Sequence, residues 1–245
     1  MEIFWEKPLS DLELSIDDIH IWRADLDLPI ISIQKLNETL SIDEKAKAER
    51  FRFEKDKRRF IAGRGILRTI LGCYLNVNPS WVQFCYGKNG KPELADTFGN
   101  GTVLFNMSDS EGLALYAFAR DLEIGVDIER IRNIPEMEQI AEQFFSLKEN
   151  EILRSLPESK KKEAFFNCWT LKEAMIKAIG DGLSYPLDSF DVSTALGGQR
   201  ELLQTQGESR EESKWSVQLL EIGPGLAAAF ALWGECRRVH CLQWS

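Results

Sequence analysis

Three observations in the sequence predict an α+β fold built from two similar halves. Helical patterns followed by strand patterns occur twice along the 245 residues. The segments RFIAGRGILRTILG and FNCWTLKEAMIKAIG are both long amphipathic patterns that end in glycine. The composition, 44% hydrophobic and 28% charged, is typical of a globular domain. We therefore expect an N-terminal α+β half over residues 1–120 and a C-terminal α+β half over residues 121–245.

The first half is expected to begin with a strand and to continue into helices. Residues 19–25, IHIWRAD, alternate in the way that a half-buried strand requires. Residues 41–75 carry apolar side chains at helical spacing, and Ser41 with Glu44 forms a capping-box pattern at their start. Two glycines in the segment AGRGI are unusual inside a helix, where each costs about 1 kcal/mol relative to alanine. They indicate close approach of another backbone or of a ligand.

Short strands with tight connections are expected next, because β-branched and aromatic residues alternate between turn residues. The segment KNGKPEL is a turn signal. The expected strands are VQFCYG, TVLFNMS, LALYAFA and IGVDIER.

The second half repeats this order of helices and strands. Residues 135–154 and about 160–179 are expected to be helical, and Ser146 with Glu149 gives a second capping-box pattern. The polar, glycine-bearing residues 197–213 predict a loop. Further strands are expected in FDVS, WSVQLLEI, LAAAFALWG and RVHCLQW.

The bulk composition narrows the class of function. A formal net charge of −9 argues against general nucleic-acid binding. No apolar run approaches the roughly 20 residues that span a bilayer, and the N-terminal segment lacks a signal-peptide pattern. Five cysteines without CxxC spacing predict free thiols in a reducing cytosol, with neither a disulfide framework nor a zinc site. We therefore expect a cytoplasmic protein with no nucleic-acid or membrane partner.

Histidine-based hydrolase chemistry is not expected. The chain has two histidines, His20 and His240, and neither has a useful neighbour in the sequence. Serine and cysteine hydrolases need a histidine base beside the nucleophile. If the protein is an enzyme, carboxylates, lysines and a metal must carry the chemistry.

The strand IGVDIER places two acids where one would suffice for solubility. Because successive side chains of a strand point to opposite faces, Asp127 and Glu129 share a face with Gly125 and lie roughly 7 Å apart along the strand. Two like charges so placed repel each other unless a cation lies between them. The alternative is a strand end whose acids meet water or nearby arginines.

The helical segment FFNCWTLKEAMIKAIGDGL offers a second cluster. Trp169, Glu173 and Lys177 recur every four residues and therefore lie along one helix face, with Lys172 at its edge. A surface Glu173–Lys177 ion pair, worth a few tenths of a kcal/mol, is the simpler explanation. The aromatic neighbours indicate instead that Glu173 is partly buried. A metal–phosphate centre would then compensate the charges of Glu173 and Lys177.

A third group of weak signals consists of lysines on the turn GKNGKPEL, the serines of FNMSDS and the basic run EKDKRRF. Turn lysines are usually solvated, but they also make good phosphate contacts.

Taken in order, the segments GKPEL, FNMSDS, GVDIER, WTLKEAMIKAIGDGL and PLDSFDV resemble the 4′-phosphopantetheinyl transferases of the larger, surfactin-synthetase-activating (Sfp) type. The resemblance runs from about residue 43 to about residue 192. It implies two similar α+β halves related by a pseudo-two-fold axis, with coenzyme A in the cleft between them. It also implies transfer of the phosphopantetheine arm to a serine of an acyl or peptidyl carrier protein. Mg²⁺ is the expected cofactor, and adenosine 3′,5′-bisphosphate is the expected second product.

The resemblance assigns the metal and catalytic residues. Asp127, Glu129 and Glu173 fall on the acidic magnesium positions, and Lys177 falls on the lysine that contacts the pyrophosphate. Since Mg²⁺ usually takes one or two carboxylates beside phosphate and water, we expect Asp127 and Glu129 as its ligands. Glu173 is then a further ligand or the base for the carrier serine, and Glu129 is the alternative base.

The coenzyme-binding positions follow in the same way. Lys91 and Ser108 match coenzyme-binding positions, and Lys47 and Arg59 lie in the segment that binds the 3′-phosphate and adenine end in relatives. Asp109 stands where the family pattern SHS has a phosphate-contacting histidine. Because an acid repels phosphate, Asp109 must lose that contact, turn away or bind a cation.

Two other functions remain open from the sequence: a non-catalytic module that binds coenzyme A or a carrier, and a different Mg²⁺-dependent phosphotransfer enzyme. For the transferase we expect a monomer, because two halves of one chain complete the cleft. The segment FFSLKENEIL offers Phe144, Phe145 and Leu147 near Lys148 as a docking surface for the carrier. The alternative is that these aromatic residues belong to the core.

Overall fold

The structure is a computed structural model that describes residues 5–7, 12–87, 89–98, 103–180, 182, 185–193, 201–206, 212–235 and 238–245. Its helices and strands follow one another as β1 (Asp18–Asp25), α1 (Ile30–Thr39), α2 (Ile42–Ala48), α3 (Glu54–Leu75), β2 (Phe84–Tyr86), β3 (Pro92–Leu94), β4 (Leu104–Ser110), β5 (Leu113–Ala119), β6 (Ile124–Arg130), α4 (Met137–Phe144), α5 (Leu147–Ser155), α6 (Glu158–Ile179), β7 (Glu201–Gln206), β8 (Glu212–Leu219), β9 (Leu226–Trp233) and β10 (Arg238–Gln243). Within these residues, no helix combines the length and the apolar character needed to cross a membrane.

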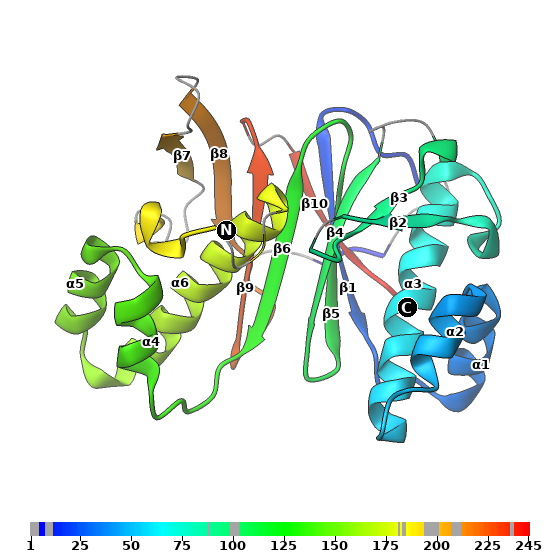
Figure 1. The fold of residues 1–245 in the computed structure, drawn as a ribbon, viewed down its shortest axis with the longest axis horizontal. Helices are drawn as coiled ribbons and strands as arrows, with labels where there is room; N and C mark the ends of the chain where they lie inside the picture. Colours follow the sequence, from blue (N-terminus) through cyan, green and yellow to red (C-terminus); the bar gives the residue numbers. More distant parts are fainter. Residues whose placement is uncertain are drawn as a thin grey trace.

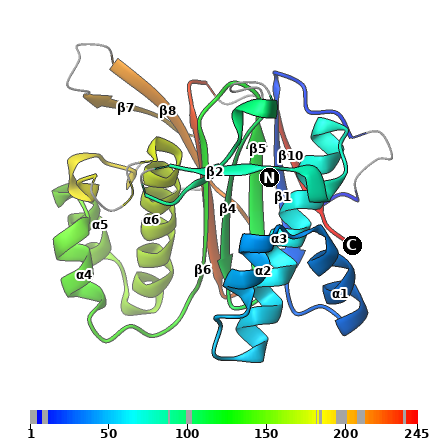
Figure 2. The ribbon, with the colours of Figure 1, turned by 45° about the vertical axis from the view of Figure 1, so that its right-hand side comes forward.

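The elements form four layers, with two sheets in the middle and helices on both outer sides (Figure 1). The first sheet has the order β10-β1-β5-β4, and α1 to α3 cover its outer face. The second sheet has the order β6-β9-β8-β7, and α4 to α6 cover its outer face (Figure 2). Apolar side chains fill the space between the two sheets, among them Ile21, Ala117, Val126 and Phe230. Burial of this apolar surface is the main force that holds the two sheets together.

The two halves repeat one topology. In the first half, β1, α3, β4 and β5 give the sheet order β1-β5-β4, and in the second half β6, α6, β8 and β9 give the order β6-β9-β8. Neighbouring strands in both sets are antiparallel. The expected α+β fold of two similar halves is therefore confirmed.

The last strand does not stay with the second half. Strand β10 pairs in parallel with β1, with Asp18 opposite Arg238 and His20 opposite His240. The chain thus returns to the first sheet after it has completed the second sheet. A domain boundary after residue 120 remains a prediction.

Several predicted elements differ from the structure in their bounds. Residues 41–75, where one or two helices are expected, form the two helices α2 and α3, whereas the helical segment expected over 135–154 is divided into α4 and α5. Both predicted capping boxes are present, and they begin α2 and α5.

The loop predicted over 197–213 is wrong for part of its length. Residues 201–206 form β7, and residues 212 and 213 begin β8, while 194–200 and 207–211 lie outside the described residues. Strand β7 forms an antiparallel ladder with β8 at the end of the second sheet. At such an edge, backbone pairing holds a strand without the apolar alternation that would have identified it in the sequence.

Close helix packing explains two glycines. A Cβ atom on Gly125 of β6 would lie 2.0 Å from the carbonyl oxygen of Ala174 on α6. A Cβ atom on Gly65 of α3 would lie 2.6 Å from Cβ of Leu36 on α1. Both distances are far inside van der Waals contact, so only glycine lets these elements approach. The predicted close approach in the segment AGRGI is thus confirmed for Gly65, and at Gly125 it sets the position of α6 against the acidic strand β6.

Buried ion pairs fix the helices on each side. Glu44 of α2 accepts hydrogen bonds from Arg64 at 2.9 Å and from Arg68 at 2.6 Å, and all three side chains are buried. In the second half, Glu149 pairs with Lys172 at 2.8 Å, and both side chains are fully buried. Such pairs are costly to break, because removal of one partner leaves a buried charge uncompensated.

Candidate active site

A buried carboxylate joins three elements where the two halves meet. Asp127 on β6 accepts a hydrogen bond at Oδ1 from Nζ of Lys177 on α6, at 2.6 Å, and another from the hydroxyl of Ser108 on β4, at 2.9 Å. Lys177 also donates to Oγ of Ser108 at 2.9 Å. The second carboxylate oxygen of Asp127, Oδ2, is buried and has no hydrogen-bond partner among the described residues. A buried carboxylate oxygen without a partner is costly, so this atom points to a missing ligand.

Two glutamates add negative charge beside Asp127. Burial raises the pKa of the Glu129 carboxyl, and the charge of Asp127 raises it further, against smaller opposing effects of Ser110, Arg132 and Lys177. Burial likewise raises the pKa of Glu173, and the charge of Asp127 adds to this, while Lys177 opposes it. The strand and helix spacing thus brings the predicted carboxylates into one electrostatic neighbourhood. We call Asp127, Glu129 and Glu173 the acidic site.

The donor set of the acidic site fits a hard divalent cation. Carboxylate oxygens are the ligands that Mg²⁺ takes, and a cation would satisfy Oδ2 of Asp127. Among the described residues, however, the three acids do not each place one oxygen within 4.8 Å of an oxygen of both others. Mutual repulsion of three acids accounts for this spacing, as does the engagement of Oδ1 of Asp127 by Lys177. The residues therefore fit a cation held by one or two carboxylates rather than an all-protein cage.

Two adjoining cavities lie beside the acidic site. The larger cavity has a volume of about 450 Å³, and the smaller cavity has a volume of about 220 Å³. They share Gly90, Pro92 and Met107. The remaining lining residues of the larger cavity are Lys47, Phe51, Asp56, Arg59, Phe60, Gly63, Arg64, Tyr86 and Asp109. Those of the smaller cavity are Asn89, Lys91, Asn106, Ile176, Lys177, Gly180 and Gly182, so both halves of the chain contribute to it.

The predicted coenzyme-binding cations divide between these cavities. Lys47 and Arg59 line the larger cavity, and Lys91 and Lys177 line the smaller cavity. Asp27 holds Arg59 through two hydrogen bonds of 2.7 Å. Lys91 donates from Nζ to the carbonyl of Ala178 at 3.3 Å. Four cationic side chains therefore line the two adjoining cavities, although Asp56 and Asp109 also line the larger cavity.

Ser108 and Asp109 are adjacent on β4 and have different surroundings. The hydroxyl of Ser108 is engaged by Asp127 and Lys177. Asp109 lies on the wall of the larger cavity, where the surrounding protein desolvates it and so raises its pKa. The positive charges of Lys177 and Arg59 lower the pKa of Asp109, but together they do not outweigh the effect of desolvation. Asp109 therefore does not turn away from the cavity but places an acid in it.

The sequence patterns did not identify several residues of the larger cavity. Phe51 and Tyr86 present aromatic side chains there, and Nη2 of Arg64 donates to the hydroxyl of Tyr86 at 3.0 Å. Tyr86 could have been identified from its position directly before the glycine-lysine turn. An aromatic ring beside phosphate-binding cations is well placed to stack on a nucleotide base. No local pattern distinguished Phe51 from a core residue.

The predicted docking segment divides between core and surface. Phe145 is 3% exposed and packs on Phe165 with ring centroids 5.2 Å apart, so its expected role on the surface is wrong. Phe144 packs edge-to-face on Trp169. Leu147 is 87% exposed and is the first residue of α5, directly after its N-cap Ser146. Of the three apolar side chains, Leu147 remains available to a partner.

Comparison with known proteins identifies the family of the chain. Residues 123–231 match the family profile described as 4′-phosphopantetheinyl transferase superfamily, and residues 32–119 match the one described as 4′-phosphopantetheinyl transferase, N-terminal. The chain is 48% identical over 180 residues to the 4′-phosphopantetheinyl transferase HetI of Nostoc sp., covering 74% of this chain and 76% of that protein.

Two further relatives come from a bacterium and from human. The 4′-phosphopantetheinyl transferase Sfp of Bacillus subtilis is 32% identical over 163 residues, covering 65% of this chain and 69% of Sfp. The human L-aminoadipate-semialdehyde dehydrogenase-phosphopantetheinyl transferase is 30% identical over 223 residues, covering 86% and 70% of the two chains. The chain therefore belongs to the 4′-phosphopantetheinyl transferase family and is an enzyme of its Sfp type.

Proposed function

We propose that the protein transfers the 4′-phosphopantetheine arm of coenzyme A to a serine of an apo carrier protein. The proposal includes dependence on Mg²⁺ and release of adenosine 3′,5′-bisphosphate. The observation that supports it most is the environment of Asp127: a partnerless carboxylate oxygen, a lysine on the other oxygen, and a cation-lined cavity beside them. A pyrophosphate ester with a bound divalent cation satisfies all three features.

The larger cavity suits the nucleotide end of coenzyme A. Lys47 and Arg59 supply positive charge for the 3′-phosphate, and Phe51 and Tyr86 supply ring faces for the adenine. Because Asp27 fixes the guanidinium of Arg59 in place, that contact needs little reorganisation when the phosphate binds.

The smaller cavity suits the pyrophosphate. Lys91 and Lys177 lie on its wall, and Lys177 also reaches Asp127. Asp127 and Glu129 would hold Mg²⁺, with Glu173 as a third ligand or as the base. When bound, the cation would neutralise charge on the pyrophosphate oxygens and favour departure of the phosphate leaving group.

The residues of the chain then divide the transfer step between them. The serine oxygen of the carrier forms a bond to the phosphorus next to the pantetheine arm, and the bond from that phosphorus to the bridging oxygen breaks. Glu173 accepts the serine proton, because its raised pKa makes it a better base than an ordinary glutamate. Lys177 stabilises the charge that develops on the leaving phosphate. Glu129 is the alternative base.

One observation favours a second candidate, a non-catalytic module that binds coenzyme A or a carrier. Asp109 places an acid on the wall of the larger cavity, where it opposes phosphate binding. Asp127, Glu129, Glu173 and Lys177 are nevertheless all present, as a transferase requires. A different Mg²⁺-dependent phosphotransfer activity would use these same acids.

The deciding experiment is incubation with coenzyme A, Mg²⁺ and a panel of apo carriers from fatty acid, polyketide and nonribosomal peptide synthesis. Intact mass spectrometry should show one phosphopantetheine arm added to at least one carrier, and none to a carrier whose acceptor serine is replaced by alanine. Coenzyme binding without any mass increase across the panel would favour the non-catalytic module. Release of phosphate products without carrier modification would favour the other phosphotransfer activity.

The proposal extends to the setting of the enzyme. Both halves of one chain line the smaller cavity, so a monomer suffices for catalysis. Cysteine thiols that are free in the described residues are consistent with a reducing cytoplasm.

A further inference from the structure

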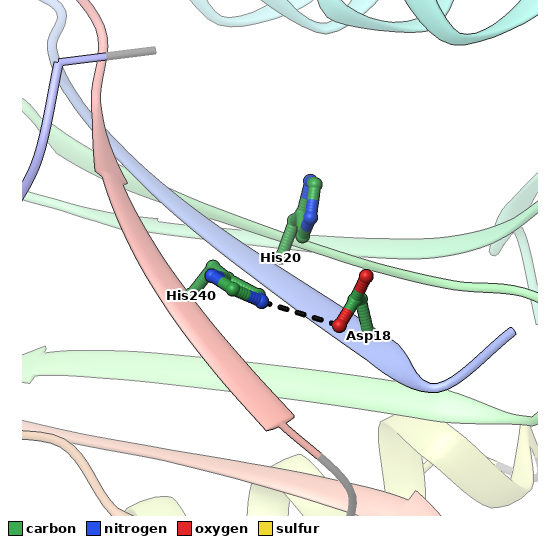
Figure 3. A group of neighbouring side chains, drawn as sticks. All are labelled: Asp18, His20 and His240. Carbon is green, nitrogen blue, oxygen red and sulfur yellow. Dashed lines mark hydrogen bonds and ion pairs between the residues drawn. The ribbon is translucent and has the colours of Figure 1, made fainter. Parts of the chain in front are cut away.

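The two histidines, distant in sequence, meet in the first sheet. Strand β10 pairs with β1 in parallel, and this register places His20 opposite His240. Asp18 lies two residues before His20 and therefore shares its face of β1. Figure 3 shows the three side chains together, with the ring of His240 directed at Asp18. One ligand atom from each residue lies within 4.8 Å of the other two.

We propose that Asp18, His20 and His240 form a binding site for a transition-metal cation of the Zn²⁺ class. We call these three residues the histidine site. It is separate from the acidic site, because β5 lies between β1 and the strand β4 that carries Ser108.

The spacing fits tetrahedral coordination. Nε2 of His240 lies 3.2 Å from Oδ1 of Asp18. With metal–ligand distances of about 2.0 Å, two ligand atoms of a tetrahedral zinc site lie about 3.3 Å apart. The distance between Nε2 of His240 and Oδ1 of Asp18 therefore already matches one ligand–ligand edge of a tetrahedral site. The ligand atom of His20 lies within 4.8 Å of both others, so the His20 side chain must move closer to complete the site, with water in the fourth position.

His20 has the support that a metal ligand needs. Its side chain is buried, and neutral imidazole is the form of histidine that binds metals. Nδ1 of His20 is 2.7 Å from the hydroxyl of Tyr74, which also accepts a hydrogen bond from Nε1 of Trp22 at 2.8 Å. The other ring nitrogen, Nε2, has no hydrogen-bond partner among the described residues.

A similar outer shell orients Asp18. The hydroxyl of Ser15 donates a hydrogen bond to Oδ2 of Asp18 at 2.5 Å, and the other oxygen, Oδ1, is directed toward His240. Outer hydrogen bonds of this kind, to a ligating ring or carboxylate, are a general feature of metal sites.

The group that a metal would displace is Arg238. Its Nε lies 2.9 Å from Oδ1 of Asp18, and its side chain is 70% exposed. An exposed ion pair of this kind contributes little to stability, so the guanidinium can leave for water at small cost. The side chain of His240 is also 44% exposed, which gives a cation a path into the histidine site.

The ligand set selects the class of metal. Two imidazoles and one carboxylate suit Zn²⁺ and neighbouring transition metals, whereas Mg²⁺ and Ca²⁺ prefer oxygen ligands alone. The expected effect is structural, because a bound metal would link β10 to β1 and so fasten the last strand of the chain to the first sheet. A cation that binds only the folded chain raises its stability in proportion to the logarithm of its concentration.

The experiment is a Zn²⁺ titration of the full chain after treatment with a chelator, followed by calorimetry and thermal unfolding. We expect about one equivalent to bind and the melting temperature to rise. Co²⁺ in place of Zn²⁺ should give the absorption bands of a four-coordinate site. His240→Ala should weaken binding at least about tenfold, with little risk to folding because that side chain is exposed. His20→Gln should do the same while it keeps a partner for Tyr74.

Glu173→Gln is the matched control, because it removes a carboxylate from the acidic site and leaves the histidine site intact. Zn²⁺ affinity should be unchanged in that variant, and Mg²⁺-dependent transfer should be unchanged in His240→Ala. Absence of stoichiometric binding, binding that survives His240→Ala, or binding that is lost in Glu173→Gln would each overturn the proposal. None of these outcomes bears on the transferase activity itself, so the two proposals fail separately.

Discussion

Lys177 donates a 2.6 Å hydrogen bond from Nζ to Oδ1 of Asp127, and this ion pair joins α6 to β6 at the acidic site. Asp127 is almost fully buried, whereas Lys177 keeps about 29% of its side chain exposed toward the smaller cavity. The lysine is therefore the partner that can turn to a ligand, while the aspartate stays fixed. This asymmetry suits a site in which the ammonium group of Lys177 is always present and a divalent cation binds together with the substrate.

The first prediction concerns Asp127→Ala. Because Asp127 carries the partnerless oxygen Oδ2, its removal should abolish the dependence of the transfer rate on Mg²⁺ and leave only slow residual turnover. Lys177 is partly exposed, so the lone charge that remains can be hydrated and the fold should survive. Initial rates over a range of Mg²⁺ concentrations test this, with circular dichroism as a check on folding. A normal Mg²⁺ response in a folded Asp127→Ala variant would remove Asp127 from the metal site.

The second prediction concerns Glu173→Gln. The amide keeps the shape of the side chain but cannot accept the serine proton, so transfer should slow by about 10² to 10⁴, the usual contribution of a general base. Coenzyme A binding should stay near that of the unchanged enzyme, as measured by calorimetry. Turnover close to normal would exclude Glu173 as the base, and the same measurement on Glu129→Gln would then test the alternative base.

Much of the fold followed from periodicity. The alternation in β1 and β6, the helical spacing in α3 and α6 and both capping boxes were visible in local sequence, because each depends on residues a few positions apart. Other features depend on partners far along the chain. The edge strand β7 has no apolar alternation to identify it, and its pairing with β8 is seen only in the structure.

For the acidic site, the strand period places Asp127 and Glu129 on one face of β6, but only the family resemblance indicates that Glu173 of α6 joins them, and their role in binding a metal stays a prediction. The histidine site was not predictable, because the parallel pairing of β10 with β1 brings its ligands together from opposite ends of the chain. Phe145 shows a third kind of limit. An aromatic residue beside exposed neighbours has the same sequence pattern in a core as on a docking surface, and only packing on Phe165 decides between them.

The third prediction separates Leu147 from Phe145. If α5 contributes to carrier docking, Leu147→Ala should weaken carrier binding several-fold and leave coenzyme A affinity unchanged, because 87% of the leucine is exposed. Phe145→Ala should instead destabilise the fold by about 3–5 kcal/mol, the usual cost of removing a core aromatic side chain. Carrier titrations and urea unfolding of both variants distinguish the two roles. Equal carrier affinity in the Leu147→Ala variant would place docking elsewhere.

The fourth prediction concerns Asp109 in the larger cavity. Asp109→Asn removes a negative charge from the wall that would receive phosphate, so coenzyme A should bind several-fold more tightly, and added salt should reduce the difference. Glu111→Gln is the matched control, because it makes the same change in charge on an exposed turn residue that lines neither cavity. Equal gains in both variants would indicate a general charge effect. A loss of affinity in Asp109→Asn would indicate that the carboxylate itself binds a cation or the coenzyme.

The fifth prediction concerns Glu44 and the dependence of stability on pH. Burial raises the pKa of Glu44, but Arg64, the backbone N–H of Ser41 and Arg68 together outweigh this effect, so the pKa lies below its usual value of 4.5. The folded state therefore holds the proton less tightly than the unfolded state. The stabilisation by Glu44 is accordingly full above about pH 4.5 and is lost as the pH falls through the lowered value.

Glu44→Gln should thus cost about 3 kcal/mol at pH 7, because it leaves two buried guanidinium groups without a carboxylate. The difference in unfolding free energy between the unchanged chain and this variant should shrink as the pH falls below 4.5. Urea unfolding at pH 7 and at several lower values measures this difference. The control is Glu38→Gln, because Glu38 of the neighbouring helix α1 makes no ion pair within the part of the chain that the structure describes. A difference that stays constant with pH would mean that the charge of Glu44 does not stabilise α2 and α3, and that its hydrogen bonds alone do so.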